Sequence, residues 1–415
     1  MSALGKRVLI AGGGLAGLAC AVRLHDAGAE ALVVESSDAP GGRVRTDVVE
    51  GFLLDRGFQV FLDAYPESGA LLDKRSLDLR PFKPGALVFH EGRLRRVMDV
   101  FRDPRHLLES VLAPIGSVAD KLRVALLKWR LGQVSIGEIA AHGDLTTEQY
   151  LQRAGFSSKI IDVFFRSFYG GIFLERELWT SSRMFEFTFK MFSQGSATLP
   201  ARGMGEITRQ LASRLPAEKI RLGERVTEIR PDGITIKSGE RLLGDAVVVA
   251  TDATTAAGLV PGLASSEPAW RSVTCLYFAA DRSPMNEAII ALNGTGSGLV
   301  NNVCVVSDVA PGYAPQGNSL ISISVLGLPE PSDLERRVVM ELQAWFGKAV
   351  HEWRHLRTDR IELALPEQAP NVGMTGPGFR HHDGVYVCGD HLWSASIEGA
   401  IISGLRTADA ILDQP

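Results

Sequence analysis

The 415-residue chain has little of what marks a metal-binding, disulfide-bonded or membrane-spanning protein. Its four cysteines lie far apart and form no C-x-x-C pair, which argues against a zinc knuckle or a redox dithiol. No window of 18 or more residues is apolar and charge-free enough to span a bilayer, and the N-terminus lacks the pattern of a secretory signal. We therefore expect buried, reduced thiols, no metal site and a cytoplasmic location.

Excess charge, internal repeats and low-complexity tracts are absent as well. With 44 basic and 48 acidic residues the net charge is −4, so we expect no nucleic-acid partner. A chain of this length exceeds one typical core, which predicts two or more domains.

The most informative positive feature is a glycine-rich loop near the N-terminus. Residues 8–11 form an apolar run typical of a buried strand, and Gly12, Gly14 and Gly17 then give the pattern G-x-G-x-x-G before a helix over residues 18–27. Gly12 permits the tight turn, Gly14 lets a pyrophosphate approach the backbone, and Gly17 lets the helix pack close to the strand. The N–H groups at the start of the helix, with Ala16, would face the phosphates.

An acidic residue follows at the distance that this type of site requires. A second apolar strand over residues 31–35 ends in Glu35, 18 residues after Gly17. Its carboxylate would accept hydrogen bonds from an adenosine ribose. Together these elements predict a dinucleotide site, although the glycine motif alone does not separate NAD from FAD.

Two further segments fit the same site. Gly41, Gly42 and Arg43 would place a guanidinium near the pyrophosphate, and the alternative is a surface hairpin with a solvated arginine. Near the C-terminus an apolar strand over residues 384–388 leads into Gly389 and Asp390 and then into a helix. Asp390 would hydrogen-bond a polyol chain, and the N-terminus of that helix would stabilise negative charge on a ring edge.

The middle of the chain differs from both ends in its amino-acid composition. Residues 160–192 contain ten aromatic side chains, which predicts either a filled helical core or a cavity for a large apolar molecule, with a helix break at Gly170 and Gly171. Residues 104–131 are amphipathic and basic. For this stretch we favour a helix that covers a substrate cavity, and the alternative is a helix that contacts a membrane surface.

With these segments in place, the chain resembles the flavin-containing amine oxidase superfamily, which also holds protoporphyrinogen oxidases and phytoene desaturases. Four separated elements carry the resemblance: Gly12-x-Gly14-x-x-Gly17 with Glu35, Gly41-Gly42-Arg43-x-x-Thr46, Arg225-Val226-Thr227, and Gly389-Asp390 with Ile397-Glu398-Gly399-Ala400.

The resemblance implies an α/β fold with a Rossmann-type, GR2-like FAD-binding domain and an interleaved α+β substrate domain. The FAD-binding domain would comprise residues 1–75, 200–260 and 380–415, and the substrate domain residues 76–199 and 261–379. The bound FAD would be noncovalent, with Glu35 at the ribose, Arg43 at the pyrophosphate, the backbone of Val226 at the adenine, Asp390 at the ribityl chain and Ile397 at the flavin ring. The full set of implied FAD contacts is Gly12, Gly14, Ala16, Gly17, Glu35, Gly42, Arg43, Val226, Gly389, Asp390 and Ile397.

The chain departs from typical amine oxidases at three points. Ser396 stands where those enzymes often have a tyrosine of an aromatic cage, no cysteine occupies a position of covalent flavin attachment, and none of the ten lysines sits in a recognisable motif. The leading hypothesis is an FAD-dependent oxidoreductase that removes a hydride from a small hydrophobic substrate, with oxygen or a quinone as electron acceptor. The alternatives are an amine oxidase with an atypical cage, and a redox-silent FAD-dependent isomerase or binding protein. We assign no catalytic side chain, and we predict that Phe58, Gln59, Tyr169 and Trp393 line the substrate pocket.

Overall fold

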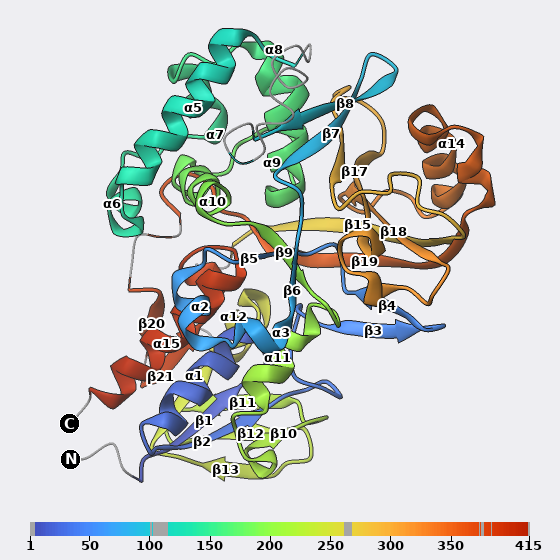
Figure 1. The fold of residues 1–415 in the computed structure, drawn as a ribbon. Coiled ribbons are helices and arrows are strands. Elements are labelled where there is room, and N and C mark those ends of the chain that lie inside the picture. Colours follow the sequence, from blue (N-terminus) through green and yellow to red (C-terminus); the bar gives the residue numbers. More distant parts are fainter. Residues whose placement is uncertain are drawn as a thin grey trace.

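The computed structural model describes residues 5–99, 102, 115–260, 268–372, 374, 377–382 and 384–413 (Figure 1). Its central sheet has the strand order β10-β2-β1-β14-β21-β20. All of these strands run parallel to their neighbours except β20, which is antiparallel to β21. In that order, the strands are Ile220–Arg221, Glu30–Val34, Arg7–Ala11, Ala246–Val249, Val385–Cys388 and Phe379–His382.

The sheet is therefore assembled from both ends and the middle of the chain, as the sequence predicts. One face is covered by the helices α1 (Leu15–Asp26), α11 (Gly205–Ala212) and α15 (Ile397–Leu412), whose apolar side chains share one core with the strands. The other face packs against α12 (Ala253–Leu259) and a small antiparallel sheet of β11 (Val226–Arg230), β12 (Gly233–Ile236) and β13 (Arg241–Leu243). This three-layer arrangement is a Rossmann-type α/β domain.

A second, mixed sheet lies beside the first and has the order β19-β15-β18-β17-β16-β7-β8 (Figure 1). The strands are Arg354–Pro366, Trp270–Ala280, Ser319–Leu326, Val300–Val305, Ile290–Asn293, Gly85–His90 and Arg93–Met98. One face of this sheet packs against α14 (Leu334–Phe346).

Short paired strands and helices connect the two sheets. The pairs are β3 (Thr46–Val49) with β4 (Phe52–Asp55), and β9 (Ala197–Pro200) with β5 (Phe61–Leu62) and β6 (Leu79–Pro81). The short helices are α2 (Pro66–Leu71), α3 (Lys74–Leu77) and α13 (Val306–Val309). The division of the chain into an FAD-binding domain and a substrate domain at the residue numbers given above remains a prediction.

A layer of helices, teal and green in Figure 1, lies at the end of the molecule opposite strands β1 and β2. It consists of α5 (Val118–Gln133), α6 (Ile136–Ala141), α7 (Thr147–Arg153), α8 (Ser158–Ile160), a π-helical turn (Ile161–Phe165), α9 (Arg166–Phe173) and α10 (Ser182–Gln194). The predicted break at Gly170 and Gly171 is wrong, because both glycines lie inside α9. A Cβ on Gly171 would lie 3.0 Å from Nδ2 of Asn301, so a larger residue there would require Asn301 to shift by a few tenths of an ångström.

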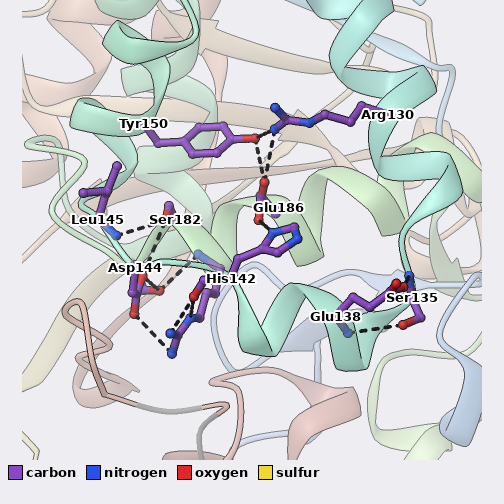
Figure 2. Close-up of polar contacts among 11 residues, drawn as sticks. Arg130, Ser135, Glu138, His142, Asp144, Leu145, Tyr150, Ser182 and Glu186 are labelled. Carbon is purple, nitrogen blue, oxygen red and sulfur yellow. Dashed lines mark hydrogen bonds and ion pairs between the residues drawn. The ribbon is translucent and has the colours of Figure 1, made fainter.

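One buried carboxylate joins the helices of this layer. Glu186 of α10 is 2% exposed and accepts hydrogen bonds from the Tyr150 hydroxyl at 2.7 Å and from Arg130 at 3.3 Å. Its other oxygen lies 2.7 Å from Nδ1 of His142 (Figure 2). These partners come from α5, α7 and the segment after α6, so the side chain of Glu186 fixes four parts of the layer relative to one another.

None of the helices among the residues placed by the structure is long and apolar enough to cross a membrane.

Replacement of Glu186 by alanine is expected to lower the free energy of unfolding by about 2 kcal/mol, because three partners lose a buried acceptor. Urea unfolding measures this effect. Glu138→Ala is the matched control, because Glu138 is an exposed carboxylate that closes a capping box on the neighbouring α6. A loss in Glu186→Ala no larger than that in the control would show that the buried network does not hold the layer together.

Candidate active site

A single cavity of about 1250 Å³ runs between the Rossmann-type sheet and the helical layer. It is lined by residues from the N-terminal loop, the middle of the chain and the C-terminal helix, including Gly14, Phe164 and Ile397. A cavity of this size and origin could hold a large ligand together with a second molecule.

The three motif glycines have the three surroundings that their predicted roles require. A Cβ on Gly12, which has φ +110°, would lie 2.6 Å from the carbonyl oxygen of Ala250, and one on Gly17 would lie 2.1 Å from that of Gly12. Gly14 differs, because a Cβ there would enter open space at the cavity wall. Gly14 also caps α1 without a side-chain hydrogen bond, so the start of the helix faces the cavity uncapped beside Ala16.

Glu35 lies at the end of β2 and lines the same wall. One carboxylate oxygen accepts a hydrogen bond from the Gly13 N–H at 2.7 Å, and the other accepts from the N–H and the hydroxyl of Ser37 at 2.8 and 2.7 Å. The carboxylate therefore braces the glycine loop in addition to the predicted role at a ribose.

Predicted residues from opposite ends of the chain meet at this wall. The N–H of Gly41 donates to the carbonyl oxygen of Gly13 at 2.8 Å, which ties the second glycine segment, with Gly42, to the first. The guanidinium of Arg43 donates to the Asp390 carboxylate at 2.6 Å and to the carbonyl oxygen of Ala364 at 3.0 Å. Arg43 is thus a cavity residue and not part of a solvated hairpin.

The C-terminal motif supplies both lining and support. Ser396 caps α15 by accepting a hydrogen bond from the Gly399 N–H at 2.9 Å, and Ile397 and Ala400 line the cavity together with Gly389. Glu398 is fully buried and is not among the described cavity residues. Its carboxylate accepts hydrogen bonds from the N–H groups of Glu67 and Ser68 at 2.8 and 2.9 Å. The carboxylate of Glu398 therefore caps α2, a role that the sequence did not predict.

The remaining predicted cavity residues fall into two groups. Val226, at the start of β11, and three of the four predicted pocket residues, Phe58, Gln59 and Tyr169, line the cavity. Trp393 lies outside the described lining. Its ring packs under the guanidinium of Arg406, 4.1 Å from the ring centroid, so this placement does not favour the predicted pocket role.

Aromatic side chains form the wall opposite the glycine loops. The lining includes Phe164, Phe168, Phe189 and Phe192, and the rings of Phe164 and Phe168 stack with their centroids 5.5 Å apart. The two readings of residues 160–192, a helical core and a cavity wall, are thus both present in one layer.

Gln59 lines the cavity next to Phe58 in the chain and is bonded to the segment of Arg43. Its amide nitrogen donates to the carbonyl oxygens of Arg43 and Arg56 at 2.9 and 3.2 Å, which fixes the orientation of the side chain. Its amide oxygen is buried and accepts no hydrogen bond from any residue that the structure describes. This oxygen is an acceptor suited to a donor on a bound molecule.

A buried aspartate holds the segment that leads to Gln59. The Asp55 carboxylate accepts hydrogen bonds from the hydroxyls of Thr46 and Tyr313 at 2.5 and 2.8 Å and from the N–H of Met204 at 3.0 Å. The main-chain carbonyl oxygen of Asp55 accepts a hydrogen bond from the Tyr277 hydroxyl at 2.7 Å. Burial raises the pKa of Asp55 to about 6, and the hydrogen bonds only partly offset that effect.

No group of three or more histidine, cysteine, aspartate or glutamate side chains suited to a metal ion occurs among the described residues.

Comparisons with known proteins agree with this arrangement. A family model described as flavin containing amine oxidoreductase matches residues 15–412. The chain is 27% identical over 169 residues to protoporphyrinogen oxidase 2 of Arabidopsis thaliana, which covers 40% of this chain and 32% of that protein. It is 35% identical over 115 residues to a 15-cis-phytoene desaturase of Synechococcus elongatus, which covers 27% of this chain and 23% of that protein.

These matches span less than half the length of either relative. Among solved structures, an oxidoreductase from Methanosarcina mazei superposes with a TM-score of 0.74 at 19% identity, covering 98% of this chain and 100% of that one. At that identity the superposition shows the shared fold.

The raised pKa of Asp55 gives a pH-dependent stability. The folded state holds the proton up to pH about 6, whereas the unfolded state releases it near its ordinary value of 3.8, so this stabilisation is present at low pH and is lost as the pH rises. Between pH 4.5 and 7.5 the wild type should lose about 2 kcal/mol of unfolding free energy relative to Asp55→Asn. Urea titrations of both proteins at the two pH values test this, and parallel pH dependences would contradict it.

Proposed function

The chain belongs to the family of flavin containing amine oxidoreductases, and on this premise we propose that it oxidises an apolar substrate by removing a hydride from a C–H bond. The chain is an FAD-dependent oxidoreductase. One observation carries the finer proposal: a single cavity joins the glycine-lined wall to an aromatic wall.

FAD fits the glycine-lined half. The open space beside Gly14 and the uncapped start of α1 suit a pyrophosphate, and Arg43 supplies a guanidinium at the same wall. We propose that Glu35 and Val226 hold the adenosine, and that Asp390 and Ile397 hold the ribityl chain and the flavin ring. None of the four buried cysteines is among the described cavity residues, which supports noncovalent binding.

The aromatic half suits an apolar substrate. Phe58, Tyr169 and the phenylalanines of α9 and α10 offer a wall that holds such a molecule and excludes water. Bound FAD would supply the two-electron acceptor for the oxidation, with oxygen or a quinone as the final acceptor. The substrate would lose a hydride to this acceptor and a proton from the neighbouring carbon, which would leave the cavity to solvent, so that a carbon–carbon double bond forms. The Gln59 amide oxygen would accept a hydrogen bond from a donor group on the bound substrate or cofactor.

Two alternatives belong to other classes. The family description favours amine oxidation, but Ser396 contributes a helix cap at the position where a cage tyrosine would stand. A redox-silent isomerase or binding protein would use the same cavity without net electron transfer.

The outer face of α5 carries exposed apolar side chains that bear on where the protein is located in the cell. Val118, Leu122, Leu126 and Trp129 lie at helical spacing and are 62–67% exposed. We propose peripheral contact of this face with a membrane, and the buried thiols favour a cytoplasmic location. The inner face of the same helix lines the cavity with Lys121, Val124 and Lys128, as expected for a helix that covers a cavity. Part of the predicted amphipathic stretch, residues 103–114, lies outside the described residues.

Gly14→Ala is expected to keep the fold and to weaken FAD binding about tenfold, because the added Cβ clashes with no protein atom but occupies the space where a pyrophosphate would approach. The ratio of flavin to protein absorbance after dialysis measures retention. Gly132→Ala on α5 is the control, because a Cβ there also meets no neighbour within 4 Å. Equal FAD retention in both variants would contradict the proposed cofactor position.

The proposed reaction is tested by mixing the oxidised holoenzyme with apolar, polyene, tetrapyrrole and amine compounds without oxygen. We expect bleaching of the flavin absorbance by an apolar compound and a product with a new carbon–carbon double bond, identified by mass spectrometry. Ammonia or an aldehyde would instead support amine oxidation. Product formation without net electron transfer would support an isomerase.

A further inference from the structure

Two polar side chains of the second sheet face the cavity side by side. Asn302 of β17 and Ser324 of β18 both line the cavity, although they are only 2% and 5% exposed. The two residues are paired across the strands, and the row continues with Leu292 of β16 on one side and Cys275 of β15 on the other. Residues paired in this way share one face of a sheet, so Asn302 and Ser324 form one polar point in an otherwise apolar row.

A chain of hydrogen bonds fixes the direction in which these side chains point. The main-chain carbonyl oxygen of Ser167, in the neighbouring helix α9, can only accept, so the amide nitrogen of Asn301 donates to it, at 3.2 Å. The same nitrogen donates to the amide oxygen of Asn302 at 3.0 Å. The amide nitrogen of Asn302 is then left for Ser324, and it donates to the hydroxyl oxygen at 3.2 Å. The direction of the whole chain therefore follows from one main-chain carbonyl.

This chain ends in a hydroxyl hydrogen at the cavity wall. A serine hydroxyl carries one hydrogen and two lone pairs, and at Ser324 one lone pair is taken by Asn302. The hydrogen of Ser324 must point elsewhere, and it meets no acceptor among the residues that the structure describes. Because Ser324 lines the cavity, this hydrogen is a donor for a molecule that binds there.

The free donor makes the wall sensitive to the chemistry of the bound molecule. In solution a water molecule can accept the hydrogen bond from Ser324. A pure hydrocarbon that displaced this water would leave the donor unpaired, which is unfavourable, whereas a molecule with an oxygen acceptor at this point would replace the lost hydrogen bond. The wall therefore discriminates between apolar molecules with and without such an oxygen.

We propose that Asn302 and Ser324 form a subsite for a neutral oxygen acceptor, such as a ketone carbonyl, on an otherwise apolar substrate. Ser324 donates to that oxygen, and Asn302 is a positioning residue that keeps the hydroxyl hydrogen free for it. The inference rests on the proposed function for the claim that the occupant is the molecule that is oxidised. The hydrogen bond itself can be measured without turnover.

The test compares 2-acetonaphthone with 2-isopropylnaphthalene, which share the naphthalene rings and differ in a carbonyl oxygen that is replaced by a methyl group. Calorimetric titration of the FAD-loaded protein gives both affinities. The infrared difference spectrum between unlabelled and isotope-labelled ketone isolates the carbonyl band of the bound molecule. In the wild type we expect this band at a lower wavenumber than in an apolar solvent, because the carbonyl accepts a hydrogen bond.

Substitutions of Ser324 locate the donor. Ser324→Ala should weaken binding of the ketone about fivefold and leave binding of the hydrocarbon unchanged, because one hydrogen bond to the ligand is lost. The carbonyl band should move to its position in an apolar solvent. Ser324→Thr keeps a hydroxyl and should keep both the band and the ratio of the two affinities.

Two further variants test the direction of the chain and the specificity of the effect. Asn302→Leu should weaken ketone binding about twofold and broaden the carbonyl band, because the Ser324 hydroxyl then has no fixed direction. Ser322→Ala is the matched control, because Ser322 lies two residues earlier in β18, is 1% exposed, contacts the Cys275 thiol at 3.3 Å and is not among the described lining residues. It should change neither affinity nor the band.

The outcomes separate this inference from the proposed function. A ketone that fails to bind the wild type, a band at the apolar-solvent position, or equal weakening of the two ligands by Ser324→Ala would overturn the subsite, even if the protein retains FAD and oxidises another compound. Equal effects of Ser324→Ala and Ser322→Ala would overturn it as well. A ketone preference that depends on Ser324 would support the subsite even if no compound reduces the flavin.

Discussion

The architecture depends on two places where the backbone of one element touches another with no side chain between them. A Cβ on Gly17 of α1 would lie 2.1 Å from the Gly12 carbonyl oxygen, and a Cβ on Gly404 of α15 would lie 2.1 Å from the Ala16 carbonyl oxygen. Helix α1 is thus held tightly against the glycine loop on one side and against the C-terminal helix on the other. Because of this packing, Arg43 and Asp390, 347 residues apart in the chain, form one ion pair at the cavity wall.

Buried carboxylates in this protein serve mainly to hold elements in place. Glu398 caps α2, Glu35 braces the glycine loop, Asp55 joins β4 to the start of α11, and Glu186 joins the cavity helices. Each accepts several hydrogen bonds, as a buried acid requires. With these acids engaged in structural hydrogen bonds, the proposed oxidation would depend on the bound cofactor, and the chain would supply the shape of the cavity that holds the substrate beside it.

The sequence predicts the parts of this fold that depend on local constraints. The strand and helix on either side of the glycine motif and the strand that leads into Gly389 follow from spacing and apolar periodicity, and the structure confirms them. Strand β19 (Arg354–Pro366) was not predicted because its residues are largely polar and partly exposed, and its partner β15 lies far away in the chain. The pair Gly170-Gly171 predicts a helix break, but both glycines lie inside α9, where a Cβ on either would pack closely against Asn301.

For the candidate site, the cofactor-binding residues could be predicted from the sequence, whereas the substrate-pocket residues could be predicted only in part. Motif residues such as Gly14, Glu35 and Asp390 sit at fixed offsets from recognisable strands, so their common wall follows from the sequence. The pocket residues lack such offsets: Trp393 and Phe58 are alike as isolated aromatics, and only the three-dimensional packing puts one under Arg406 and the other in the cavity.

The charge of the cavity lining bears on which substrate class the fold can accept. Among the described lining residues, nine cations face six carboxylates; the cations are Arg43, Arg45, Arg56, Lys83, Arg102, Lys121, Lys128, Arg225 and Arg360. Three of these cations, Arg45, Arg56 and Lys83, pair with the carboxylates of Asp38, Asp47 and Glu287, which lie outside the lining, so ion pairs behind the wall match the excess of cations over carboxylates. The net charge of the wall therefore selects neither an amine nor an anion. Ser396 caps α15 where a cage tyrosine would stand in an amine oxidase, so it offers no aromatic face to a cationic amine, and the shape and apolarity of the aromatic wall are left to decide which molecules bind.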